Sequence, residues 1–164
     1  MKTRRRWWLA WLLLPALVSA AAPELTLRDV DGRSRHVREF IGRGQWTVVA
    51  VWSVDCVICQ REIPDVAFFH DEHRGKDARV LGVSVDGFAD RARIRRFIDD
   101  NSLSFPNLIA ERAEIVKFGA GPLLGTPTYL IFAPNGKLAA RRVGATDIAE
   151  LERIIAESGK RPIT

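Results

Sequence analysis

Two cysteines, Cys56 and Cys59, are the only thiols of the 164-residue chain, and they stand three positions apart in the stretch WSVDCVICQREIP. Thiols at this spacing could form a structural disulfide, bind a metal or act as a redox pair. A bridge closing so short a loop would remove little chain entropy, and a domain of this length does not need one to fold. A haem attachment requires histidine after the second cysteine, where the chain has Gln60.

A zinc site usually has four protein ligands, and the sequence has no second cysteine pair. His70 and His73 follow at helical spacing, but they lie about four turns further along the expected helix. They also fall in the polar segment HDEH, which is typical of surface histidines. The cysteines therefore favour a redox pair, with its own disulfide in place of a cofactor and with no metal.

A strand and a helix are expected to position this pair. Residues Trp46 to Ser53 form a continuous valine-rich apolar run, which favours a strand buried on both faces. A helix is predicted from Cys56 to about Glu72, so Cys56 stands at its N-terminus and Cys59 one turn later. Free backbone N–H groups and the helix dipole would stabilise a thiolate on Cys56, which makes it the nucleophile and Cys59 the resolving thiol.

The rest of the chain alternates strands with helices, which predicts an α/β fold. Asp31-Gly32 and Asn135-Gly136 are turn signals of two antiparallel hairpins. The expected strands are Leu25 to Arg28, Arg35 to Val37, Arg79 to Val85, Thr128 to Ala133 and Lys137 to Val143. The further expected helices are Asp90 to Asp100, Arg112 to Phe118 and a C-terminal helix with Thr146 as its N-cap.

Residues 1–22 have a basic head, an apolar run and a small-residue end, which predicts a secretory signal peptide preceding one domain over residues 23–164. Cleavage after Ala20 or Ala22 is expected, and an uncleaved N-terminal anchor is the alternative. Removing residues 1–22 would lower the formal net charge from +5 to +1, so nothing favours nucleic acid as a partner. The arginines of DRARIRRFIDD are interpreted as a solvated helix face.

The cysteine stretch, the later run GTPTYLI and the PNGK hairpin together resemble the TlpA/ResA-like branch of the thioredoxin superfamily. The likeness extends over nearly all of Pro23 to Ser158. It implies a thioredoxin fold, in which helices flank a central mixed β-sheet, with the N-terminal β-hairpin and an inserted βα unit.

The resemblance also implies roles for individual residues. Pro127 matches a cis-proline that faces the cysteine pair, and Thr126 the residue whose backbone pairs with a bound substrate. Glu62 lies one helical turn beyond Cys59 and matches a glutamate that could carry a proton to or from that thiol. Pro64 matches a proline that kinks the active-site helix.

Three positions near the cysteine pair matter for its chemistry. Two of them carry residues that differ from those of relatives, and the third completes the surroundings of the pair. The family usually has tryptophan where this chain has Asp55, and minimal thioredoxins have a buried aspartate where it has Ala50. Asp55 and Trp52 are assigned to the substrate-binding surface. A carboxylate beside Cys56 would disfavour the thiolate, and neither Val57 nor the residue after it brings a compensating cation, which predicts a reducing pair.

The expected function is that of a periplasmic or extracytoplasmic thiol–disulfide oxidoreductase that reduces disulfides in partner proteins as a monomer. The resemblance implies apocytochrome c or copper-handling proteins as partners and a membrane thiol protein as electron donor. Two alternatives stay open: a peroxide-reducing enzyme, although the expected proline- and threonine-bearing loop is missing, and a non-catalytic copper-binding module of the same fold.

Overall fold

The computed structural model describes residues 22–160, so the predicted signal peptide lies almost entirely outside the described residues. Seven strands form one mixed sheet in the order β2-β1-β5-β4-β3-β6-β7. The central β3 pairs in parallel with β4 and antiparallel with β6. The strands are β1 (Thr26–Asp29), β2 (Ser34–His36), β3 (Trp46–Trp52), β4 (Ala78–Ser84), β5 (Asn107–Ile109), β6 (Thr128–Phe132) and β7 (Leu138–Val143).

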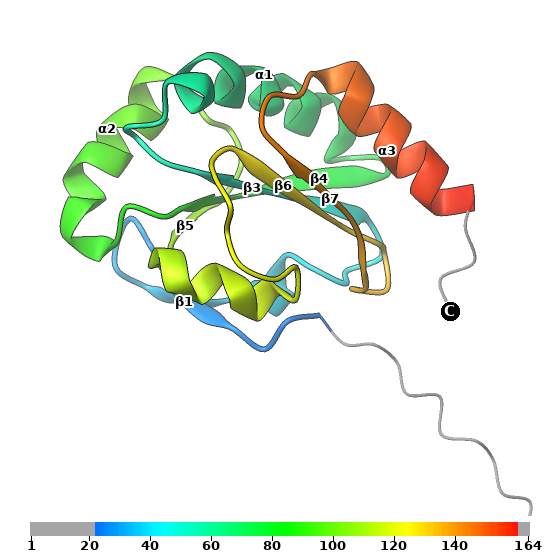
Figure 1. Ribbon diagram of the computed structural model, residues 1–164, viewed down its shortest axis with the longest axis horizontal. Helices are drawn as coiled ribbons and strands as arrows, with labels where there is room; N and C mark the ends of the chain where they lie inside the picture. The colour runs from blue at the N-terminus through cyan, green and yellow to red at the C-terminus, as the bar shows by residue number, and fades with distance from the viewer. Residues whose placement is uncertain (1–21, 161–164) are drawn as a thin grey trace, which may run out of the picture.

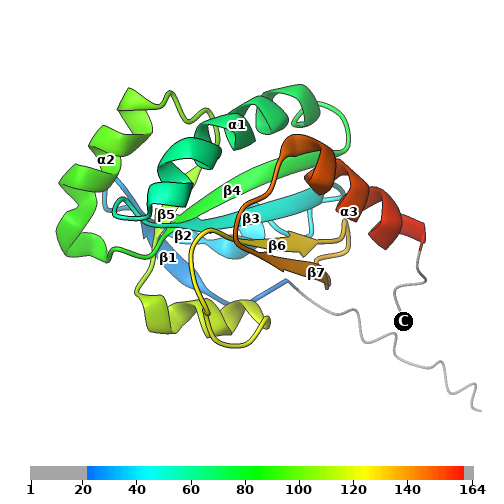
Figure 2. The same cartoon turned by 45° about the horizontal axis from the view of Figure 1, so that its top comes forward.

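Helices cover both faces of this sheet (Figures 1 and 2). One face carries α1 (Val57–His73), α2 (Arg91–Asp100) and α3 (Ile148–Lys160), and their apolar residues share one core cluster. The other face carries the 3-10 helix η3 (Arg112–Phe118) and the N-terminal segment, which includes the short η1 (Val37–Glu39). A further 3-10 turn, η2 (Phe88–Asp90), leads into α2.

Alternation along β3 divides the core between these two faces. Val48, Ala50 and Trp52 belong to the cluster under the helices, whereas Val49 and Val51 belong to the cluster on the η3 side. All five side chains are buried, because a central strand has layers on both faces. The buried strand predicted from the continuous apolar run is therefore confirmed.

The thioredoxin fold and both hairpins are confirmed, with two local differences. The inserted unit consists of α2 followed by β5, and the three-residue β5 had not been predicted because it is too short to show a periodic pattern. The N-cap of α3 is Asp147, whose Oδ1 accepts the Glu150 N–H at 2.7 Å, rather than Thr146.

A glycine in β4 lets a side chain from β5 reach β3. The Asn107 Oδ1 atom accepts a hydrogen bond from Trp52 Nε1 at 3.2 Å, and a Cβ atom on Gly82 would lie 2.0 Å from that same Oδ1. The missing side chain at Gly82 is therefore a condition for the buried link between Asn107 and Trp52.

The first described residue is packed into the domain. Ala22 is buried in the core cluster on the η3 side, where it meets the turn between β6 and β7. A Cβ atom on Gly136 would lie 2.9 Å from the Ala22 nitrogen, so this turn packs directly against the backbone of Ala22. Within residues 22–160, no helix has the length and hydrophobicity needed to cross a bilayer.

Candidate active site

The cysteine pair lies where β3 passes through the four-residue segment 53–56 into α1. Cys56 is the N-cap of α1, and its Sγ atom accepts a hydrogen bond from the Cys59 N–H at 3.1 Å. The two residues form a disulfide with their Cα atoms 5.2 Å apart. Cys56 is partly exposed and Cys59 is fully buried, so a partner protein can reach only the first sulfur.

A cis peptide bond between Thr126 and Pro127 faces this disulfide. The Sγ atom of Cys56 lies 3.3 Å from the carbonyl oxygen of Thr126, and the Pro127 carbonyl accepts the Gly144 N–H at 2.9 Å. The cis-proline predicted at Pro127 is confirmed, and Thr126 lies directly beside the attacking sulfur. The pairing of its backbone with a bound substrate stays a prediction.

The turn before Cys56 is braced by Asp86, a residue that the sequence reasoning missed. One Asp86 oxygen accepts the Ser53 hydroxyl at 2.6 Å, and the other accepts the Val54 N–H at 3.0 Å and the Ser84 hydroxyl at 2.6 Å. These bonds fix the backbone that presents Cys56. The available signal was an acid two residues after the end of the buried strand β4.

Asp55, the carboxylate next to Cys56, has a cationic partner from another element, although neither Val57 nor Ile58 supplies one. Asp55 pairs with Arg93 of α2 at 2.6 Å, and this hydrogen bond raises the pKa of Arg93. Both side chains are exposed, Arg93 by 50% and Asp55 by 72%. The interpretation of the arginine-rich helix as a merely solvated face is thus incomplete, because one arginine reaches the active-site turn.

Trp52 does not lie on a substrate-binding surface, so its assignment to that surface is wrong. Its ring is completely buried and stacks on Phe97 of α2 with centroids 4.6 Å apart, and its N–H is bonded to Asn107. The alternation of β3 turns Trp52 into the core under the helices. Trp52 therefore supports the site by packing in the core and not by contact with a substrate.

Glu62 lies on α1 and contacts the chain after β7. Its Oε2 atom accepts the backbone N–H of Thr146 at 3.0 Å, so the half-buried carboxylate joins α1 to the start of α3. Its negative charge also acts on the buried Tyr129, whose pKa is raised first by burial and then by Glu62. Pro64 lies inside α1, as expected, and the helix continues through it.

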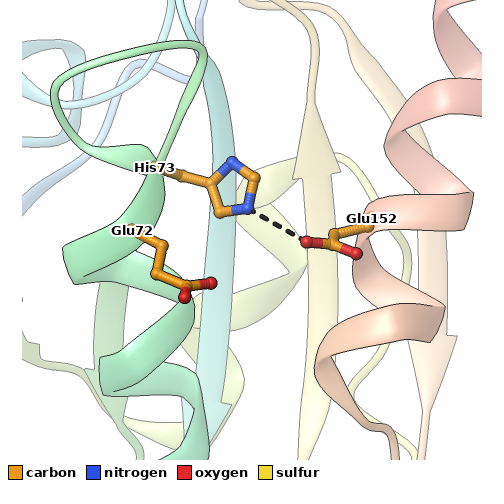
Figure 3. A group of neighbouring side chains, drawn as sticks. All are labelled: Glu72, His73 and Glu152. Atoms are coloured by element: carbon orange, nitrogen blue, oxygen red, sulfur yellow. Dashed lines mark hydrogen bonds and ion pairs between the residues drawn. The ribbon is translucent and has the colours of Figure 1, made fainter.

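The two histidines of α1 lie far from the disulfide along the helix. His70 is buried and its Nδ1 accepts the Val80 N–H at 3.0 Å, so its interpretation as a surface residue is wrong. His73 Nδ1 lies 2.8 Å from Asp77 Oδ1. Its Nε2 lies 3.3 Å from Glu152 Oε1 of α3 (Figure 3).

The carboxylate of Glu72 points towards the same space, and these three side chains are the one group within residues 22–160 that could meet on a cation (Figure 3). Within this group, the contact between His73 and Glu152 links α1 to α3.

A disulfide at the start of a helix, opposite a cis-proline on a mixed sheet, is the arrangement of a thioredoxin-fold thiol–disulfide oxidoreductase. Residues 18–141 match the AhpC/TSA family, and the chain belongs to that family. The resemblance to the TlpA/ResA-like branch is confirmed, since its relatives include proteins named thiol-disulfide oxidoreductase ResA.

The chain is similar to the thiol-disulfide oxidoreductase ResA of Geobacillus thermodenitrificans, with 26% identity over 74% of this chain and 66% of the relative. It is also similar to the sporulation thiol-disulfide oxidoreductase A of Bacillus subtilis, with 23% identity over 67% of this chain and 66% of the relative. The alignment thus spans just under two thirds of the length of each relative.

Two solved structures have the same fold. A thiol:disulfide interchange protein of the thioredoxin family from Chlorobium tepidum superimposes with a TM-score of 0.71 at 20% identity, covering 84% of this chain and 94% of that one. StoA from Bacillus subtilis superimposes with a TM-score of 0.62 at 21% identity, covering 79% and 94%.

Proposed function

We propose that the protein is an extracytoplasmic thiol–disulfide oxidoreductase that reduces disulfides in partner proteins. The observation that carries the proposal is the unequal pair of sulfurs: Cys56 is partly exposed beside Thr126, and Cys59 is buried beneath it. An exposed sulfur can attack a protein disulfide, and a buried one within bonding reach can then release the product.

The reaction begins with the reduced pair. The Cys56 thiolate, stabilised by the Cys59 N–H, attacks one sulfur of the partner disulfide, and the released partner thiolate takes up a proton. Cys59 then loses its proton to Glu62 and attacks Cys56, which breaks the mixed disulfide and expels the second partner thiolate. The partner gains two electrons, and the chain is left with the Cys56–Cys59 disulfide.

The partners and the location are inferred from the sequence and from this chemistry. The signal-like residues 1–22 support a location outside the cytoplasm, either free after cleavage or tethered by an uncleaved N-terminal helix. Because such compartments are oxidising, a membrane thiol protein must return electrons to the pair. Apocytochrome c cysteines and thiols of copper-handling proteins are the substrates that we propose for the monomeric domain.

The test is a trapping experiment with Cys59→Ala in the full chain, expressed with its own N-terminus. Cys56 should retain its partner as a mixed disulfide that reductant releases, and Cys56→Ala is the matched control that should retain none. Purified wild-type protein should also catalyse the reduction of insulin by dithiothreitol. No trapped partner together with no insulin reduction would reject the proposal.

A further inference from the structure

Residues 119–127 form an irregular segment that carries the cis-proline to the cysteine pair. Three of these nine residues are glycines, and Gly119 and Gly121 have positive φ angles of 82° and 76°. A segment so rich in glycine has many conformations open to it, so its position depends on the contacts that hold it. Thr126, near its end, lies beside Cys56, so the order of this segment bears directly on the active site.

A single arginine of β7 holds the first half of this segment. Arg141 donates from one terminal nitrogen to the Ala120 carbonyl at 2.6 Å and from the other to the Pro122 carbonyl at 2.8 Å. It lies opposite Leu130 of β6, which belongs to the core cluster on the η3 side, so both side chains point to that face of the sheet. Within residues 22–160 its acceptors are these carbonyl oxygens and no carboxylate. Arg141 therefore fixes the backbone of the segment and is not half of an ion pair.

The second half of the segment is held by other bonds. The Thr128 hydroxyl donates to the Gly125 carbonyl at 2.7 Å, and the Pro127 carbonyl accepts the Gly144 N–H at 2.9 Å. These bonds do not involve Arg141, so the cis peptide bond keeps its place without that side chain. Loss of the arginine should therefore loosen the first half of the segment and leave the geometry of the sulfurs unchanged.

The part of the segment between these two sets of bonds presents an apolar side chain to solvent. Leu124 is 73% exposed, whereas its neighbour Leu123 packs against the core cluster on the η3 side. Leu124 stands two residues before Thr126, so the Cα atoms of the two residues lie within about 7 Å of each other. Val57, which follows Cys56 in the chain, is 69% exposed. Two of the four large apolar side chains exposed in the described part of the chain therefore lie within two residues of the contact between Cys56 and Thr126.

We propose that Arg141 is a positioning residue that holds Leu124 as an apolar contact for the partner protein. Leu124 thereby favours partner disulfides in which an apolar residue stands next to the cysteine. This inference rests on the proposed function and names the kind of substrate that its site prefers. The exchange of electrons is the one already described, because Cys56 still attacks one sulfur of the partner disulfide and expels the other as a thiolate.

Two physical effects support this preference. Contact between Leu124 and an apolar residue of the partner removes the surface of both side chains from water. A loop that is already ordered loses less conformational entropy when the partner binds, so Arg141 increases the gain from that contact. Charge does not compete with this effect, because Asp55 and Arg93 pair with each other at 2.6 Å and together carry no net charge.

The experiment compares the reduction of three disulfides by the reduced full chain. One is a small aromatic disulfide, and the other two are otherwise identical peptides closed by a disulfide, with either leucine or serine next to each cysteine. Each second-order rate constant is divided by that with dithiothreitol, which removes differences in the reactivity of the disulfides themselves. Wild-type protein should then prefer the leucine peptide over the serine peptide by about fivefold.

The variants separate the contact from its positioning. Leu124→Ser should abolish the preference, and Arg141→Met should reduce it to about twofold. Both variants should reduce the small aromatic disulfide at the wild-type rate, because that substrate has no chain to meet the loop. Arg141→Lys keeps the charge but has one donor nitrogen where arginine has two terminal ones, so it should retain an intermediate preference. Adding Arg141→Met to Leu124→Ser should cause no further loss, since both act through one contact.

The matched control is Phe68→Ser, which removes a side chain of similar exposure, 65%, from α1 and should keep the wild-type preference. Equal normalised rates of the wild-type protein with the two peptides would overturn the inference. So would a wild-type preference in Leu124→Ser or in folded Arg141→Met, with folding checked by the unfolding midpoint. If Arg141→Met does not fold, a wild-type preference in Arg141→Lys has the same meaning. A wild-type protein that does not reduce the aromatic disulfide would overturn the proposed function itself.

Discussion

The substitution Gly82→Ala tests the buried link between β4, β5 and β3. A methyl group at this position would lie 2.0 Å from Asn107 Oδ1 and 2.7 Å from the Phe105 ring, both too close for any real contact. Asn107 would have to withdraw, and Trp52 Nε1 would lose its only observed partner. Because Trp52 ends the strand that leads to Cys56, the site would lose support from below.

The expected cost follows from these two effects. Forcing a methyl group into a packed core costs about 1–3 kcal/mol, and leaving a buried N–H unpaired costs about 1–3 kcal/mol. The free energy of unfolding should therefore fall by about 2–6 kcal/mol for Gly82→Ala. At about 3 °C per kcal/mol for a domain of this size, Tm should drop by roughly 6–18 °C.

Urea and thermal unfolding of the oxidised protein measure this cost. The control is Gly75→Ala, where an added Cβ atom would meet nothing within 4 Å, and it should stay within about 1 kcal/mol of wild type. Asn107→Ala should cost less in the Gly82→Ala background than alone, because removing the Asn107 side chain there relieves the clash with the new methyl group. If Gly82→Ala unfolded within about 0.5 kcal/mol of Gly75→Ala, the steric reasoning would be wrong.

Three further predictions concern charge and reactivity. Arg93→Gln should make the pair more reducing and Asp55→Asn less reducing, as measured by equilibration in glutathione buffers, because the exposed pair sets the local charge next to Cys56; equal potentials would refute this. Burial lowers the pKa of His70, so the unfolded chain takes up a proton first on acidification, and the free energy of unfolding should fall below about pH 6.5. Urea midpoints across this range should depend less on pH in His70→Gln, and identical slopes would contradict the assignment. The reduced protein should consume hydrogen peroxide no faster than a small free thiol does, because Cys56 Sγ lies against the Thr126 carbonyl oxygen and, within the described residues, accepts a hydrogen bond only from the Cys59 N–H; rapid consumption would revive the peroxide-reducing alternative.

The framework of the site was predictable because its signals are local. The apolar run of β3, the cysteine spacing and the Thr-Pro motif each occupy a few consecutive residues, and they give the strand, the helix start and the cis bond. His70 could have been recognised as buried, since it continues the stripe of Ile63 and Val66 along α1. The alternation of β3 likewise places Trp52 with Ala50 in the core.

The contacts that finish the site were not predictable, because they join residues far apart in the chain. Arg93 reaches Asp55 over 38 positions, and Thr146 reaches Glu62 over 84. Such pairs depend on how the inserted α2 and the terminal α3 lie over the sheet. No periodic pattern in the sequence indicates that arrangement. The missing partner of Tyr129 is a property of the packed core alone.

The packing of Ala22 distinguishes between the two expected processing positions. Its side chain fills space beside Gly42 and Gly136, and its carbonyl oxygen lies 3.5 Å from Arg38 Nε. Cleavage after Ala20 would keep this residue and its contacts in the mature chain. Cleavage after Ala22 would remove them and leave a charged amino group at Pro23 beside an apolar turn. Ala22 is therefore a structural part of the domain, and a chain that begins at Pro23 should be less stable than one that begins at Ala21.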